Sequence, residues 1–200
     1  MTDRRRASLA SLPTLLGVGR ILATPLIMTL LLADWPGSSL TAGLLFVIAA
    51  LSDFADGWIA RARNQVSPLG VFLDLAADKV LVAGVLIAMV EIGLVPTWMA
   101  ATILIREFVV QAVRQLAAVE DVVISARALG KAKTLATLAG LALLCLASDA
   151  ATGGPMSSLV AGGTLEAVGF WVMVVATLLT LVSGLAYLRG AWPMLAGSST

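Results

Sequence analysis

Six long apolar segments dominate this chain of 200 residues and leave it few ways to fold. Each is close to the ~20 residues that an α-helix needs to cross about 30 Å of hydrocarbon. Hydrophobic residues make up 60% of the chain, a share typical of integral membrane proteins. The alternation expected of barrel strands is missing, so we predict an all-α integral membrane protein, a six-transmembrane-helix bundle. The predicted spans are Leu12–Leu32, Ser39–Trp58, Val71–Ile92, Thr97–Ala118, Ala132–Ala147 and Leu165–Leu188.

The basic residues at or beyond the ends of the predicted spans all fall on one side of the bundle. The three connections on the opposite side carry only acids, namely Asp34, Glu91 and Asp149. Because lysine and arginine are retained on the cytoplasmic side, we expect cytoplasmic N- and C-termini in a multi-pass protein of the cell inner membrane. The nine residues on the basic side are Arg4, Arg5, Arg6, Arg61, Arg63, Arg127, Lys131, Lys133 and Arg189.

The chain is expected to form one domain with short flanks. Residues 1–11 carry three arginines and are either an interfacial segment on an anionic leaflet or an ordinary topogenic flank. Residues 12–190 form the six-helix domain, and 191–200 a flexible tail. The one cysteine, Cys145, provides no disulfide framework, and histidine is absent, which excludes imidazole as metal ligand or base.

Four aspartates lie inside the apolar segments, where each carboxylate costs roughly 2.5–3.5 kcal/mol. Asp56 and Asp53 lie about 7 and 12 Å below Arg61, which marks the cytoplasmic end of one helix. Asp74 and Asp78 lie about 6 and 12 Å below Gly70, which marks the start of the next helix. The i,i+3 and i,i+4 spacings put each pair on one helical face. The short connection makes the two helices neighbours, so we expect four carboxylates to converge on one point open to the cytoplasm.

Such a cluster needs positive charge, and hard oxygen ligands without histidine or cysteine favour Mg²⁺ or Mn²⁺. Carboxylate sites of this kind usually handle phosphate groups between two metal ions. The small residues Gly57 and Ala60 let a ligand approach the backbone closely, and Arg61 offers a bidentate fork for phosphate oxygens. The sequence therefore predicts a two-metal site that binds a phosphorylated substrate.

The run D-x2-D-G-x2-A-R-x8-G-x3-D-x3-D, from Asp53 to Asp78, resembles the signature of the CDP-alcohol phosphotransferases, with every position filled. Within that family, further segments resemble the bacterial phosphatidylglycerophosphate synthases. The resemblance covers roughly residues 11–145. Its other segments are Leu12–Arg20, Ser52–Phe54, Arg63–Val66, Phe72–Lys79, Ile105–Phe108 and Leu129–Thr134.

The resemblance implies a fold, a reaction and roles for single residues. It implies a homodimer of six-helix subunits that transfers a phosphatidyl group from CDP-diacylglycerol to sn-glycerol 3-phosphate and releases CMP, among membrane lipids and without a nucleic-acid partner. Asp78 would also be the catalytic base that takes the acceptor's proton. The implied ligands of the two metal ions are Asp53, Asp56, Asp74 and Asp78, and the implied CDP-binding residues are Asp56, Gly57, Ala60, Arg61 and Gly70.

Basic residues outside the signature, in or near the fourth and fifth predicted spans, fit the binding of a phosphorylated acceptor. Arg106 and Arg114 are eight residues apart and lie on roughly one helical face. Lysines at a helix N-terminus, here Lys131 and Lys133, suit a phosphate. The alternatives are topogenic charge for the lysines and an internal pair with Glu107 for Arg106. The predicted acceptor-phosphate residues are Arg106, Arg114, Arg127, Lys131 and Lys133.

Other functions stay open from the sequence. The cationic cluster argues against serine as acceptor but does not separate glycerol phosphate from inositol phosphate, and phosphatidylglycerol is a further possibility. A divalent-cation transporter would also place carboxylates in the membrane, although here the acids sit near one face only. The roles of Lys79 and Arg20 stay undecided: Lys79 is expected to pair with the aspartates, and Arg20 either pairs with an inward acid or touches the donor's diphosphate.

Overall fold

A computed structural model describes residues 12–63, 68–120 and 127–196, and within these ranges it is helical without strands. Six long helices occupy the six predicted segments. The predicted N-terminal segment, residues 1–11, lies outside the described residues. The helices are α2 (Leu12–Leu31), α3 (Ser38–Arg63), α4 (Pro68–Glu91), α5 (Thr97–Val119), α6 (Arg127–Ala151) and α7 (Gly162–Leu195), with a short 3₁₀ helix η1 (Pro155–Ser158) before α7.

Three helix bounds differ clearly from those predicted, and the first is the end of α3, which lies at Arg63 rather than Trp58. α6 begins at Arg127 rather than Ala132, because the basic residues ahead of the apolar run continue the helix. α7 continues to Leu195, so much of the predicted flexible tail is helical, and Ala191 is fully buried. An apolar run marks the part of a helix that can lie in the core or in hydrocarbon. The helix itself extends as far as its backbone bonding allows.

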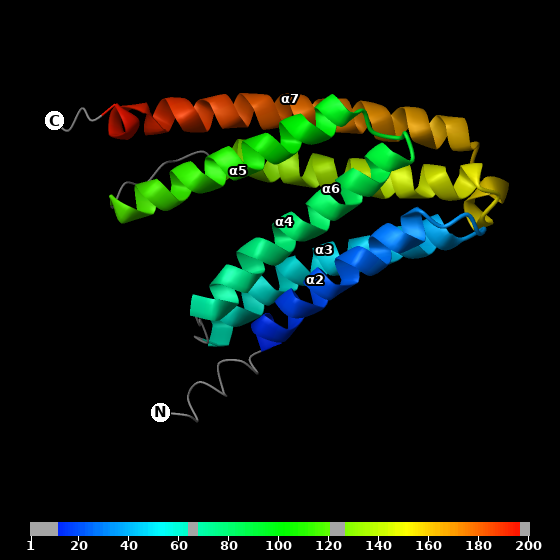
Figure 1. The fold of residues 1–200 in the computed structure, drawn as a ribbon, viewed down its shortest axis with the longest axis horizontal. Helices are drawn as coiled ribbons and strands as arrows, with labels where there is room; N and C mark the ends of the chain where they lie inside the picture. The colour runs from blue at the N-terminus through cyan, green and yellow to red at the C-terminus, as the bar shows by residue number, and fades with distance from the viewer. Residues whose placement is uncertain (1–11, 64–67, 121–126, 197–200) are drawn as a thin grey trace.

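Consecutive helices run in opposite directions, so alternate connections lie at the same end of the bundle (Figure 1). The most extensive packing is between α6 and α7, followed by α2 against α4 and α2 against α3. α3 also packs on α6, and this contact joins the first three helices to the last three. The start of α2, the end of α3 and the start of α4 meet at one end, which is the end that carries the aspartates.

Two helices are long and apolar enough to cross a membrane by length and composition, over Leu129–Ala151 and Gly162–Met194 in the described part of the chain. Shorter apolar helices cover Leu15–Leu31 and Ser38–Ser52. α3, α4 and α5 carry ionisable residues inside their apolar runs, and these residues interrupt the hydrophobic stretch. The fold is therefore an all-α bundle in which α3, α4 and α5 each carry charged residues within the helix.

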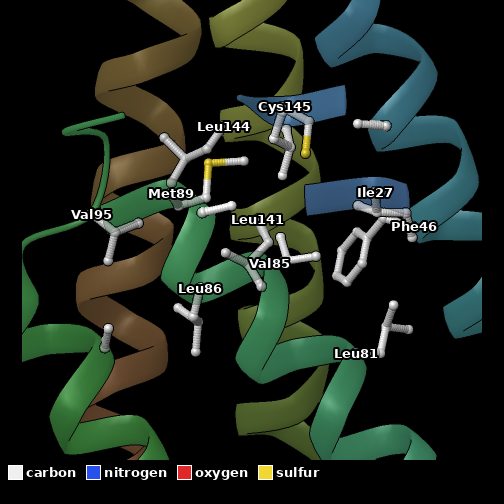
Figure 2. Close-up of a cluster of buried hydrophobic side chains, with 14 of the residues drawn as sticks. Ile27, Phe46, Leu81, Val85, Leu86, Met89, Val95, Leu141, Leu144 and Cys145 are labelled. Carbon is white, nitrogen blue, oxygen red and sulfur yellow. The ribbon is translucent and has the colours of Figure 1, made fainter. Parts of the chain in front are cut away.

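The buried core cluster takes residues from all six long helices, and part of it is drawn in Figure 2. Phe46 of α3 and Leu86 of α4 are among its largest fully buried side chains. Small residues let the helices approach: a Cβ on Gly43 would lie only 2.8 Å from the Cβ of Cys145. The residues drawn in Figure 2 include Ile27, Phe46, Leu81, Val85, Leu86, Met89, Val95, Leu141, Leu144 and Cys145.

A buried carboxylate fastens the opposite end of the bundle. Asp149 of α6 is fully buried, and its two oxygens accept the backbone N–H of Leu40 at 3.3 Å and of Met156 at 3.0 Å. Beside it the hydroxyls of Ser39 and Ser148 are 2.8 Å apart. These bonds satisfy N–H groups at the starts of α3 and η1, which have no partner within their own helices. The polar residues far from the aspartates therefore serve to join helices.

Candidate active site

The backbone brings the two aspartate pairs to matching levels. Asp56 and Asp53 lie about 10 and 15 Å before the end of α3, counted at 1.5 Å per residue. Asp74 and Asp78 lie about 9 and 15 Å after the start of α4. Five peptide steps join Arg63 to Pro68, so these helix ends lie within about 18 Å of each other. The observed helix bounds keep the pairing of levels that the sequence predicts.

Only Asp78 has a described side chain among the four aspartates, so the convergence of all four remains a prediction. The same holds for the predicted CDP-binding residues. Gly57, Ala60 and Arg61 fall in the last two turns of α3 and Gly70 in the first turn of α4, in segments whose side chains lie outside the described residues. The donor set fits a divalent metal, because two pairs of carboxylates at matching levels on two connected helices would supply hard oxygen ligands alone.

Asp78 lies on the rim of a pocket between α4, α5 and α6. Its side chain is 41% exposed, and one of its oxygens lies 3.6 Å from the Nζ of Lys79. Thr134 and Thr137 of α6 also line the pocket. The pocket thus combines acidic, basic and hydroxyl side chains with apolar ones. Its lining residues are Asp78, Lys79, Val82, Ile103, Leu104, Glu107, Phe108, Lys133, Thr134, Thr137 and Leu138.

Glu107 of α5 lines the same pocket and joins three basic side chains. Its carboxylate pairs with the ammonium groups of Lys79 from α4 and Lys133 from α6, and with Arg106 Nη1 at 2.9 Å. The other terminal nitrogen of Arg106 donates to Ser183 Oγ of α7 at 2.9 Å. The side chain of Glu107 is only 12% exposed and that of Lys133 only 9%. We call Lys79, Arg106, Glu107, Lys133 and Ser183 the Glu107 cluster; it ties together four helices.

The structure separates the cations that the sequence grouped as an acceptor-phosphate site. Lys133 lines the pocket, whereas Arg106 does not and forms the internal pair with Glu107 that was the alternative reading. Arg114 lies over the ring of Tyr187, 5.9 Å from its centre. Lys131 is exposed on α6, and the side chain of Arg127 lies outside the described residues. Of the four whose side chains are described, only Lys133 lines the pocket with Asp78.

Ser183 was not identified from the sequence, which also leaves the role of Arg20 undecided. The sequence did not indicate a role for Ser183, because a single serine in an apolar helix belongs to no recognisable motif. Arg20 is buried in α2, with only 3% of its surface exposed. A Cβ on Gly17 would touch Leu73, and one on Gly84 would meet Thr24, so Arg20 lies near the level of the turn that carries Asp78. A buried guanidinium therefore stands beside the acidic end of α4.

Comparison with known proteins gives a consistent result. The family model described as CDP-alcohol phosphatidyltransferase matches residues 10–185. A CDP-diacylglycerol–glycerol-3-phosphate 3-phosphatidyltransferase of Bacillus subtilis is 33% identical, over 94% of this chain and 99% of the relative. An enzyme of the same name from Rickettsia bellii is 34% identical, over 90% and 94%.

A CMP-forming cardiolipin synthase of Oryza sativa is 32% identical, over 94% of this chain and 59% of the relative. Relatives with two different names therefore share similar identity with this sequence. The match to the family model covers the aspartate signature, both helices that carry it and the Glu107 cluster. The resemblance stated from the sequence is confirmed: this chain belongs to the CDP-alcohol phosphatidyltransferase family.

Proposed function

We propose that this chain transfers the phosphatidyl group of CDP-diacylglycerol to sn-glycerol 3-phosphate, forming phosphatidylglycerophosphate and CMP. The observation that carries the proposal is the pocket lined by Asp78 together with Lys79 and the buried Lys133 of the Glu107 cluster. Asp78 can receive an acceptor's hydroxyl and the lysines its phosphate. The enzymes of Bacillus subtilis and Rickettsia bellii that carry this name support the choice of substrates.

The donor's diphosphate would lie at the aspartate quartet, Asp53, Asp56, Asp74 and Asp78. Two divalent ions, Mg²⁺ or Mn²⁺, bound there would neutralise the diphosphate and stabilise the charge that develops on the leaving CMP. Gly57, Ala60, Arg61 and Gly70 are the proposed contacts to CDP. The helix levels of the quartet and the absence of histidine from the chain support oxygen-only ligation.

The acceptor's 1-hydroxyl would attack the phosphatidyl phosphorus directly. A new P–O bond forms to the acceptor, the P–O bond to CMP breaks, and the hydroxyl proton passes to Asp78 or to solvent beside it. Asp78 is accessible from the pocket, as this role requires. No covalent enzyme intermediate is involved, because the proposed site offers no separate nucleophile.

Charge favours a phosphomonoester as the acceptor. Lys79, Arg106 and Lys133 carry three positive charges against the one negative charge of Glu107, which leaves +2 when Asp78 is engaged with metal. A phosphomonoester is close to a dianion at neutral pH. Phosphatidylglycerol, the acceptor for a cardiolipin synthase, carries a single phosphodiester charge. The rice relative makes cardiolipin synthesis the second candidate function. The net charge of the cluster matches glycerol 3-phosphate better.

We further propose that all six helices cross the cell inner membrane, with both termini and the active site on the cytoplasmic side, in a homodimer. Alternation of helix direction and the nine basic residues at one end support this orientation. The Glu107 cluster offsets the charges of α4 and α5 that interrupt their apolar runs. Membership of a phosphatidyltransferase family removes the reason for considering a cation transporter.

An acceptor competition assay tests the choice of acceptor. Membranes containing the protein are given CDP-diacylglycerol with equal amounts of labelled glycerol 3-phosphate, inositol phosphate, phosphatidylglycerol and serine. We expect phosphatidylglycerophosphate as the main product, because a phosphomonoester meets the charge of the cluster and the relatives named for glycerol 3-phosphate favour it over inositol phosphate. Membranes with the Asp56→Asn variant provide the background of the host's own enzymes. Cardiolipin or an inositol lipid as the main product would contradict the proposal.

A further inference from the structure

Glu107 poses a question that the proposed reaction does not answer. It lines the pocket whose lysines would bind the acceptor's phosphate, and its carboxylate repels any anion placed there. A site selected only for positive charge would bind phosphate better without it. Its contacts suggest another role, because one carboxylate holds cations from α4, α5 and α6 at a single point.

The two lysines need such an anchor. Lys79 and Lys133 belong to different helices, and their ammonium groups both contact Glu107. Without the carboxylate, two like charges in a poorly solvated bundle would move apart, and a flexible lysine side chain loses considerable entropy when a ligand must order it. If Glu107 already holds the two ammonium groups in place, binding of the phosphate does not have to order them.

Arg106 fixes Glu107 in turn. Its guanidinium spans from Glu107 to Ser183 Oγ, and Ser183 itself donates to the backbone oxygen of Thr180. The stem of Arg106 lies against α7, since a Cβ on Gly184 would come within 2.9 Å of its Cγ. The chain of contacts therefore begins on α7 and ends at the pocket, so α7 can influence acceptor binding although Ser183 does not line the pocket.

We propose that Glu107 is a positioning residue for the acceptor: with Arg106 and Ser183 behind it, it holds Lys79 and Lys133 as a preformed clamp for a phosphomonoester. This inference rests on the proposed function. It extends that function by giving the carboxylate and the α7 serine a part in acceptor affinity, whereas the donor is proposed to bind at the aspartate quartet.

The test is steady-state kinetics of Glu107→Gln and Ser183→Ala with both substrates varied. We expect the acceptor KM to rise at least about tenfold for Glu107→Gln and about threefold or more for Ser183→Ala, because hydrogen bonds to charged groups are lost. The KM for CDP-diacylglycerol should change by less than about twofold. Glu107→Asp, which keeps the charge, should recover most of the acceptor affinity.

Matched variants serve as controls. Glu120→Gln removes an exposed carboxylate from the end of the same helix, and Thr177→Val removes a buried α7 hydroxyl that bonds only within its own helix. Neither should alter the acceptor KM. If Glu107→Gln does not fold, Ser183→Ala decides the question, because it removes one hydroxyl and leaves the buried charges balanced.

The outcomes separate this inference from the proposed function. If the unsubstituted protein releases no CMP with glycerol 3-phosphate, the proposed function fails. If it does, but Glu107→Gln or Ser183→Ala leaves the acceptor KM unchanged or lowers it, only the positioning role is overturned. An equal loss toward both substrates would also overturn it, since that pattern indicates general damage to the bundle.

Discussion

Replacing Asp56 or Asp74 with asparagine should reduce CMP release by at least about a thousandfold while the protein remains folded and inserted. Asparagine keeps the size of the side chain and removes its charge. The quartet would then carry too little negative charge to hold two divalent ions beside a diphosphate. The two positions lie on different helices at matching levels, so both substitutions should have the same effect.

The measurement is CMP release from CDP-diacylglycerol and glycerol 3-phosphate, with membrane insertion checked for each variant. Asp34→Asn is the matched control, because this exposed carboxylate follows α2 at the opposite end of the bundle. It should leave the rate unchanged. Substantial activity in either quartet variant would remove that aspartate from the site.

Lys133→Met should raise the acceptor KM about a hundredfold and leave the KM for CDP-diacylglycerol nearly unchanged. Lys133 is buried, lines the pocket and pairs with Glu107. Loss of a desolvated charge contact commonly costs 2–5 kcal/mol, and about 2.7 kcal/mol corresponds to a hundredfold change in affinity. Methionine retains the apolar length of the side chain, so the packing of α6 is largely preserved.

Lys131→Met is the comparison, two residues earlier on the same helix. Lys131 is exposed and lies outside the pocket lining. Its ammonium is screened by solvent, so we expect the acceptor KM to rise only about threefold. A larger effect at Lys131 than at Lys133, or equal losses toward both substrates, would show that the pocket is not the acceptor site.

The helices could be predicted from the sequence because hydrocarbon leaves few alternatives. The starts of α2 at Leu12 and α5 at Thr97 agree with the predicted segments. The long extension of α7 could not be predicted, because Arg189 and Pro193 read as the end of an apolar run although the backbone continues past both. Apolar patterns locate spans, and they do not locate helix ends.

The site was predictable where its residues are close in sequence. Spacing alone put Asp53 with Asp56, and Asp74 with Asp78, on single helical faces, and the observed helix bounds keep them at matching levels. The Glu107 cluster was not predictable in this way. Its members come from four helices, and sequence spacing does not tell which helices face each other. For this reason Arg106 was grouped with the phosphate ligands, although it lies behind Glu107.

The most direct test of the account is CMP formation by the purified protein from CDP-diacylglycerol and glycerol 3-phosphate, with Mg²⁺ and after its removal by a chelator. We expect CMP and phosphatidylglycerophosphate in equal amounts with Mg²⁺, loss of both products in chelator, and recovery when Mg²⁺ or Mn²⁺ is restored. CMP formation that persists in chelator, or that needs no acceptor, would contradict a metal-dependent transfer to glycerol 3-phosphate.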